Sequence, residues 1–224
     1  DLPCQNRSSL LPGGDCSLTA YRKALDAFVD AVAPPRFAVI GDSMGGTLAV
    51  MIALDRPDRV AQVAVLDGAG LLPKLPGKTV RMYIPFLIPA MVRAPGPKSA
   101  RKLLVKAVFH DPAFADAAWV QAVVEGWTPR DRRRGLIRSG FALRREDASV
   151  AADLERLRVP TLIVSGREDL QFPWPGAEAA SRRIAGSRFV AIDGAGHFPM
   201  VEKPEATARI LAEFLDGAAP PEIR

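Results

Sequence analysis

The chain has 224 residues, of which 48% are hydrophobic and 25% are charged, which is typical of a soluble globular protein with one domain and room for an insertion. Its formal net charge is +5, but the basic residues are spread along the chain without interleaved aromatic residues, so we expect no nucleic-acid partner. No apolar run reaches the ~20 residues of a membrane span, because Pro85 and Pro89 interrupt the apolar stretch over 82–92.

The two cysteines, Cys4 and Cys16, both lie in the N-terminal segment. They lack metal-ligand spacing and have no histidine nearby, so we expect neither a zinc site nor a cysteine nucleophile. We expect two free thiols in a cytoplasmic protein, while a disulfide between them stays open for an exported one.

Hydrophobic periodicity predicts alternating helices and strands. A helix is expected over 18–32, with Ser17 as its N-cap and Pro34-Pro35 after its end. The pattern then predicts, in chain order, a strand over 37–40, a helix over 46–54, a strand over 60–66, a strand over 161–164, a helix over 177–184, a strand over 188–192 and a helix over 204–215. This alternation predicts an α/β fold, with a mostly parallel sheet flanked by helices.

The stretch between the second and third predicted strands has a different character. It is rich in proline at first, and it then carries helix-like segments over 100–109, 113–125 and 132–143. We interpret residues 68–150 as a helical lid inserted into a core made of residues 1–67 and 151–224. The apolar residues of this lid favour a hydrophobic acyl or aromatic substrate, or simple packing of the lid on the core: Leu71, Leu72, Met82, Tyr83, Ile84, Phe86, Leu87, Ile88 and Met91.

Residues 41–45 read G-x-S-x-G between a predicted strand and a predicted helix. This pattern is typical of a nucleophile elbow, a sharp turn that holds the serine, here Ser43, in a strained conformation with its hydroxyl above the sheet. We expect glycine to be required at Gly41 and Gly45, because a Cβ atom at either position would collide across the turn. The backbone N–H of Met44, at the start of the helix, is expected to stabilise an oxyanion.

Only two histidines can serve as the base that a serine nucleophile needs. His197 lies in a glycine-rich loop directly after a predicted strand, where an imidazole stands above the carboxyl edge of the sheet. His110 lies in the insertion, where a helix cap or a surface position is expected. We therefore expect His197 to be the base.

The acid that orients this base should follow another strand at the same edge. Asp169 follows the third predicted strand and is our first choice, with Asp67, at the end of the second, as its rival. Glu168 is adjacent but is expected to point elsewhere. The order Ser, Asp, His along the chain is the one typical of this architecture.

These residues resemble the α/β-hydrolase superfamily, in its lidded branch of esterases, lipases and C–C bond hydrolases. The resemblance rests on the elbow, on the G-R-E-D-x-x-x-P segment that ends at Pro173, and on the G-A-G-H-F-P-M-V-E-K-P-E run from Gly194. It implies that Ser43 is the nucleophile, His197 the base and Asp169 the orienting acid, with no metal and no cofactor.

The N-terminus resembles the D-L-P-G-x-G-x-S turn of this family through Asp1-Leu2-Pro3 and Arg7-Ser8, but Cys4 and Asn6 stand where glycines are usual. In the family, the first strands and a His-Gly loop with a second oxyanion donor precede this turn. We therefore expect an N-terminally incomplete hydrolase whose elbow strand is an open sheet edge. Loss of one oxyanion donor costs roughly 100- to 1,000-fold in rate, so the chain alone is expected to be nearly inactive.

The sequence thus predicts hydrolysis of a carboxylic ester of a hydrophobic small molecule through an acyl-enzyme. The alternatives are C–C hydrolysis of a ring-cleavage product, perhydrolysis, and a non-catalytic hydrolase-like binding protein. Serine at the elbow argues against epoxide hydrolases and haloalkane dehalogenases, which use aspartate there. A dinucleotide site at Gly68-Ala69-Gly70 is rejected because the third glycine of that fingerprint is missing.

Overall fold

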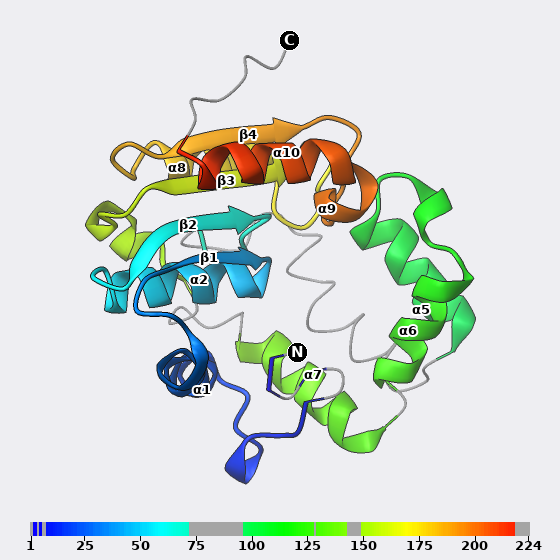
Figure 1. The fold of residues 1–224 in the computed structure, drawn as a ribbon. Helices are drawn as coiled ribbons and strands as arrows, with labels where there is room; N and C mark the ends of the chain where they lie inside the picture. The colour runs from blue at the N-terminus through cyan, green and yellow to red at the C-terminus, as the bar shows by residue number, and fades with distance from the viewer. Residues whose placement is uncertain are drawn as a thin grey trace.

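The structure is a computed structural model that describes residues 2, 3, 5, 8–71, 96–127, 129–142 and 149–217. Its four described strands form one fully parallel sheet in the order β1-β2-β3-β4, so that their carboxyl ends meet at one edge (Figure 1). Their bounds are β1 (Phe37–Asp42), β2 (Val60–Leu66), β3 (Thr161–Gly166) and β4 (Arg188–Ile192). The predicted α/β class is confirmed.

Two of these strands are longer than their sequence pattern predicts. β1 continues to Asp42 and β3 continues to Gly166, because both pairs of extra residues still lie in register with neighbouring strands. The predicted strands over 60–66 and 188–192 have the bounds that the structure gives. The extra residues matter for function, since they extend both strands to the sheet edge where the candidate site residues Ser43 and Asp169 follow them.

Helices connect and cover these strands. Among the described residues the helical elements are η1 (Pro12–Gly14), α1 (Leu18–Val32), α2 (Met44–Asp55), α5 (Pro97–Leu103), the π-helix η3 (Leu104–Val108), η4 (Pro112–Phe114), α6 (Ala117–Trp127), α7 (Arg130–Ala142), η6 (Ala151–Arg156), α8 (Trp174–Ser181), α9 (Pro199–Glu202) and α10 (Pro204–Leu215). The predictions for α1, with Ser17 as its N-cap, and for α10 are confirmed to the residue. α8 begins three residues before the predicted start, because a helix accommodates proline in its first turn and Pro175 lies there.

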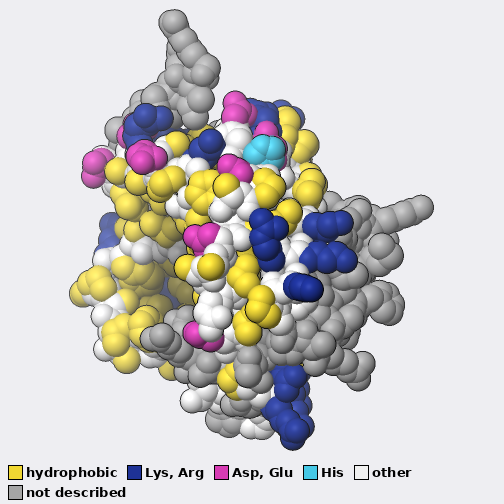
Figure 2. All heavy atoms as spheres, turned by 90° about the vertical axis from the view of Figure 1, so that its right-hand side faces the viewer, with side chains coloured by type: hydrophobic (Ala, Val, Ile, Leu, Met, Phe, Trp, Pro, Cys, Tyr) yellow, Lys and Arg dark blue, Asp and Glu magenta, His cyan; other side chains and the backbone are white. Residues whose placement is uncertain are grey.

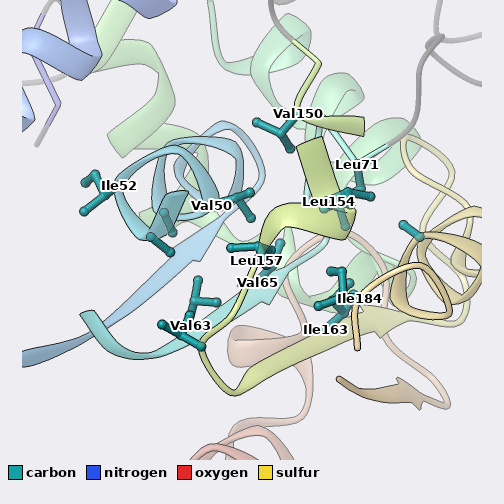
Figure 3. Close-up of a cluster of buried hydrophobic side chains, with 14 of the residues drawn as sticks. Val50, Ile52, Val63, Val65, Leu71, Val150, Leu154, Leu157, Ile163 and Ile184 are labelled. Carbon is teal, nitrogen blue, oxygen red and sulfur yellow. The ribbon is translucent and has the colours of Figure 1, made fainter. Parts of the chain in front are cut away.

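The sheet is buried on both faces by two separate hydrophobic clusters. Side chains of α2, β2, β3 and α8, together with Ile184 after α8, form one of them (Figure 3), which includes Val50, Val63, Val65 and Ile163. The alternate residues of β2, β3 and β4 point to the opposite face, where they pack against α10: Ala64, Leu66, Leu162, Val164, Val190, Ile192, Ile210 and Phe214. Burial on both faces explains why these strands read as nearly continuous apolar runs.

β1 lies at one end of the sheet and pairs only with β2 among the described residues. Its side chains Phe37 and Val39 pack against the first cluster, but Ile40, on the opposite face, is 46% exposed. Phe28 and Val32 of α1 are each 60% exposed as well. Among the described residues, the free edge of β1 therefore accompanies exposed apolar side chains.

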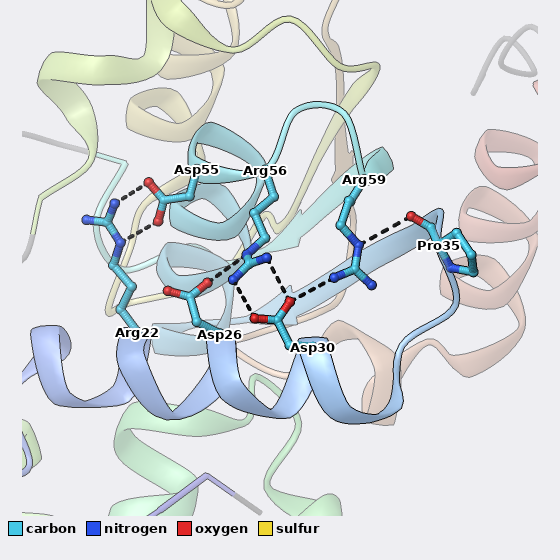
Figure 4. Close-up of polar contacts among 7 residues, drawn as sticks. All are labelled: Arg22, Asp26, Asp30, Pro35, Asp55, Arg56 and Arg59. Carbon is cyan, nitrogen blue, oxygen red and sulfur yellow. Dashed lines mark hydrogen bonds and ion pairs between the residues drawn. The ribbon is translucent and has the colours of Figure 1, made fainter.

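An ion-pair network holds α1 against α2 and the turn that leads into β2 (Figure 4). Arg56 binds Asp30 with two hydrogen bonds of 2.8 and 2.9 Å, and Arg59 binds the same carboxylate at 2.9 Å. Arg22 binds Asp55 at the other end of α1. These side chains remain partly exposed, so solvent screens each pair, and the main effect of the network is to orient α1.

Within the predicted insertion, the described residues 96–127 and 129–142 are mostly helical and lie beside the sheet (Figure 1). It has its own hydrophobic cluster around Phe109, and the hydroxyl groups of Ser139 and Tyr21 lie 2.5 Å apart, which connects α7 to α1. Lys and Arg side chains gather over part of this side of the molecule (Figure 2). α5 and η3 carry four of these exposed basic side chains, namely Lys98, Arg101, Lys102 and Lys106. The basic residues are therefore less evenly spread over the surface than along the sequence. Among the described helices, none combines the length and the apolar composition that a membrane span requires.

Candidate functional site

Ser43 occupies the turn between β1 and α2, with φ 52° and ψ −118°. A positive φ is costly for a residue with a side chain and persists only where the surroundings impose it. Here the Ser43 N–H donates to the carbonyl of Leu66 at 2.8 Å, and its own carbonyl accepts from Gly46 and Ala69, each at 3.1 Å. The backbone on both sides of Ser43 is therefore fixed to β2 and to the loop that follows it.

Close backbone packing requires glycine at one of the two predicted positions and not at the other. A Cβ atom on Gly41 would lie 2.1 Å from the carbonyl oxygen of Gly45, so this prediction is confirmed. The prediction for Gly45 is wrong, since a Cβ atom there would have no neighbour within 4 Å. The second close approach occurs at Gly46, where a Cβ atom would lie 2.7 Å from the side chain of Val65.

This difference gives a matched pair of substitutions. We expect Gly41→Ala to lower the free energy of unfolding by about 3 kcal/mol, because a backbone clash cannot relax by side-chain rotation. Gly45→Ala should change it by less than about 1 kcal/mol, and in the stabilising direction, since alanine is the better helix former. Urea unfolding of both variants measures the contrast. Equal losses of stability would contradict the close approach at Gly41.

The loops after β3 and β4 bring an aspartate and a histidine into direct contact. Asp169 Oδ2 and His197 Nδ1 are 2.9 Å apart, and both side chains are almost completely buried. The other carboxylate oxygen of Asp169 accepts the Gln171 N–H at 2.6 Å. Phe172 and Phe198 flank the imidazole, with ring centroids 5.5 and 5.4 Å from its centre. The imidazole is thus oriented by a carboxylate within apolar surroundings.

Asp169 and His197 each stabilise the charged form of the other, and this stabilisation outweighs the cost of burying the charges. Burial alone would raise the pKa of Asp169, but the hydrogen bond and charge of His197 outweigh it and lower this pKa below 3.8. Burial would likewise lower the pKa of His197, but the hydrogen bond and charge of Asp169 raise it above 6.5. Asp169 is therefore an anion at neutral pH, available to stabilise an imidazolium.

The two rival acids occupy other positions. Asp67 directly follows β2 at the same edge, is fully buried, and its Oδ1 accepts the Gly166 N–H at 3.0 Å. Glu168 accepts the N–H of Ala195 at 3.1 Å, so it points away from the pair, as expected. Ligand atoms of Asp67, Asp169 and His197 lie within 4.8 Å of one another. Because they bond to each other and to backbone N–H groups, we assign no cation to them.

Asp42 adds a third carboxyl group at this edge, and this one is partly buried. It is the last residue of β1 and directly precedes Ser43, and its buried Oδ1 has no hydrogen-bond partner among the described residues. Burial raises the pKa of Asp42 to about 7, although the charge of His197 opposes this shift. The G-x-S-x-G pattern leaves the residue before the serine unspecified. The sequence therefore does not predict a titrating carboxyl group at Asp42.

Two further residues that the sequence analysis did not single out fix the loop that carries His197. A Cβ atom on Gly166 would lie 2.0 Å from the carbonyl oxygen of Gly196, so the loops after β3 and β4 touch through their backbones. Glu202 of α9 is 5% exposed, and its two carboxylate oxygens accept the N–H groups of Gly196, at 2.6 Å, and Asp111, at 2.9 Å. The only sequence signal for Glu202 was its place in the C-terminal motif.

Glu202→Gln tests this connection, because the amide of glutamine offers one acceptor oxygen in place of two. One buried N–H then loses its partner, and we expect the free energy of unfolding to fall by about 1–3 kcal/mol. Glu205→Gln, at an exposed position of α10, is the matched control and should change it by less than about 0.5 kcal/mol. If thermal or urea unfolding cannot separate the two variants, Glu202 does not hold the loop.

Several predicted residues take no part in this cluster. Met44 is the first residue of α2, where a helix leaves backbone N–H groups without intrahelical acceptors. His110 is exposed, as expected, and lines a cavity of about 240 Å³ beside Glu168 and Leu170. Leu71 packs in the core rather than against a substrate space. The other apolar residues predicted for the lid, and Cys4, lie outside the described residues, while Cys16 is buried.

Curated proteins that resemble the chain are hydrolases. The chain is 23% identical to 2-hydroxy-6-oxononadienedioate/2-hydroxy-6-oxononatrienedioate hydrolase of Klebsiella pneumoniae, over 97% of its own length and 75% of that protein. It is 26% identical to the monoacylglycerol lipase ABHD6 of Bos taurus, covering 93% of the chain. The chain spans 63% of the length of this lipase, so it corresponds to only part of that relative.

Solved structures with the same fold include a thermophilic esterase from Thermogutta terrifontis, with a TM-score of 0.76, 22% identity and coverage of 97% of this chain and 78% of that one. Another is 2-hydroxy-6-oxo-6-phenylhexa-2,4-dienoate hydrolase (BphD) from Rhodococcus sp. strain RHA1, with a TM-score of 0.82, 18% identity and coverage of 96% and 78%. The sequence profile of the alpha/beta hydrolase family matches residues 1–210. The fold, the edge that carries the polar cluster and this match together mean that the chain belongs to the alpha/beta hydrolase family.

Proposed function

We propose that the protein is a serine hydrolase that cleaves a carboxylic ester of a hydrophobic small molecule through an acyl-enzyme. The observation that carries this proposal is the 2.9 Å contact between Asp169 and His197, at the sheet edge where Ser43 has a positive φ. A nucleophile, a base and an orienting acid are the three parts that acyl transfer to serine needs.

In the proposed reaction, Ser43 Oγ attacks the ester carbonyl carbon while His197 accepts the hydroxyl proton. Asp169 holds the imidazole in the tautomer whose Nδ1 carries hydrogen, which leaves Nε2 free to act as the base, and its charge stabilises the imidazolium. The imidazolium then returns the proton to the leaving alkoxide, and water releases the acid by the same steps in reverse order. The backbone N–H of Met44 is the oxyanion donor that we assign within this chain.

An apolar substrate is favoured by the rings beside the base. Phe172 and Phe198 give the imidazole apolar surroundings, and the helical segment 96–142 adds Phe109 and Trp119, in contact with Phe198. Apolar walls with few polar groups are typical of sites for hydrophobic ligands. We infer that residues 68–150 act as a lid over this site.

A second candidate is C–C bond hydrolysis, since one relative in sequence and one in structure carry names of such hydrolases. Turnover of p-nitrophenyl butyrate and of a 2-hydroxy-6-oxo-dienoate by the purified full-length protein compares the two activities. We expect kcat/KM to favour the ester by at least about tenfold, in the range by which a binding pocket discriminates between substrates. Preference for the dienoate would overturn the ester assignment, and turnover of neither would favour a binding protein.

A further inference from the structure

The carboxyl group of Asp67 has no role in the proposed acyl transfer, although it is fully buried beside the Asp169–His197 pair. Its own backbone is well fixed. The Asp67 N–H donates to the carbonyl of Val164 at 2.9 Å, and its carboxyl oxygens accept the Gly166 N–H at 3.0 and 3.4 Å. Both the main chain and the side chain of Asp67 are therefore attached to the end of β3, from which the loop with Asp169 departs.

Two carboxylates this close in a buried site cannot both be ionised without a large cost. Asp169 is the ionised one, since it accepts hydrogen bonds from His197 and from the Gln171 N–H. Asp67 faces Asp169 and Asp42, and among the described residues one backbone N–H, that of Gly166, donates to it. Burial, together with the charge and hydrogen bond of Asp169, raises the pKa of Asp67 to about 10, so at neutral pH it carries its proton.

We propose that Asp67 is a positioning residue that acts as a neutral carboxylic acid and donates a hydrogen bond to Asp169, which fixes the carboxylate that orients His197. This role rests on the proposed function, because it serves the pair on which acyl transfer depends. The geometry behind this role is the hydrogen bond from the Gly166 N–H to Asp67, the contact between Asp169 and His197, and carboxyl oxygens of Asp67 and Asp169 that lie within 4.8 Å of each other. A donated hydrogen bond also makes Asp169 a weaker base, so the proton stays on the imidazole.

Two variants separate this role from the alternatives. Asp67→Asn keeps a donor toward Asp169 and an acceptor for Gly166, and asparagine tolerates the φ of 42° at this position. Asp67→Gly also suits that φ but removes both groups. We expect Asp67→Asn to keep kcat within about threefold of the wild-type value, while Asp67→Gly lowers kcat about 10- to 100-fold with KM nearly unchanged, the effect of losing a hydrogen bond to a charged group.

The pH dependence of kcat gives a second readout that a merely structural side chain would not change. The wild-type protein should lose activity as pH rises through about 10, because Asp67 then ionises beside Asp169. Asp67→Asn cannot ionise and should keep its activity in that range. Asp42, Asp169 and His197 also face this site and titrate, but they are present in both proteins, so their contributions cancel in the comparison.

Unfolding provides a readout that does not depend on catalysis. The pKa of Asp67 is about 10 in the folded state and 3.8 as a model value, so between these pH values the folded state holds a proton that the unfolded chain has lost. Wild-type stability should therefore fall, relative to Asp67→Asn, as pH rises through this window, with a difference of up to one proton. Parallel curves would overturn the proposal.

The kinetic arm has its own contradicting outcomes. If Asp67→Asn loses as much kcat as Asp67→Gly, the proton on Asp67 is not what supports Asp169. If neither variant changes kcat, Asp67 only fills space. Should the full-length protein show no turnover of any kind, the proposed function fails, while the unfolding curves still decide whether Asp67 is protonated.

Discussion

Ser43→Ala is expected to lower kcat by about 10⁶-fold, the loss found when the nucleophile of a serine triad is removed. The structure gives the reason, because Ser43 alone occupies the strained turn at the end of β1, and its backbone hydrogen bonds to Leu66, Gly46 and Ala69 do not involve its side chain. The substitution therefore removes the hydroxyl and leaves the turn intact.

Steady-state hydrolysis of p-nitrophenyl butyrate measures this loss, with circular dichroism as the check on folding. The stability of the variant should stay within about 1 kcal/mol of the wild-type value, as is usual where no buried group loses a partner. A Ser43→Ala protein that retains more than a few per cent of the activity would remove Ser43 from the proposed mechanism.

Asp169→Asn is expected to lower kcat by about 10⁴-fold, with KM little changed. This carboxylate accepts the His197 N–H on Oδ2 and the Gln171 N–H on Oδ1. An amide can accept only one of them with its oxygen, so its NH₂ group must oppose the other. If it opposes His197, the imidazole takes the tautomer whose Nε2 carries hydrogen and cannot accept a proton from Ser43.

The pH profile of Asp169→Asn adds a direction to this prediction. The charge and hydrogen bond of Asp169 raise the pKa of His197, so their loss lowers it, and the residual activity should rise at a lower pH than in the wild-type protein. Kinetics from pH 4 to 9 test both points. The matched substitution is Asp67→Asn, and a 10⁴-fold loss there, with Asp169→Asn active, would exchange the roles of the two acids.

Local sequence patterns predict most of the scaffold because local physics determines it. The apolar run over 60–66 and the amphipathic segments over 18–32, with its Ser17 cap, and 204–215 have the bounds that the structure gives. The predicted acid and base lie in contact because the carboxyl ends of neighbouring parallel strands meet at one edge. In each case, the hydrophobic periodicity of single segments contains the information that the prediction needs.

Contacts between distant segments explain what the sequence does not reveal. Gly46 is required because Val65 of another strand approaches it, whereas Gly45, two positions from Ser43, faces open space. Glu202 reaches Asp111, which is 91 residues away, and no pattern relates the two. The proton on Asp67 depends on burial and on the distance to Asp169, which become defined only when β2 and β3 pair.

The central claim, that Ser43 is a nucleophile activated by the His197–Asp169 pair, is tested most directly by covalent labelling of the full-length protein with a fluorophosphonate, followed by mass spectrometry of its peptides. The predicted result is one phosphonyl group on Ser43, with labelling that is slowed strongly in His197→Ala and absent in Ser43→Ala. A label on another residue, or an unlabelled wild-type protein, would contradict the account.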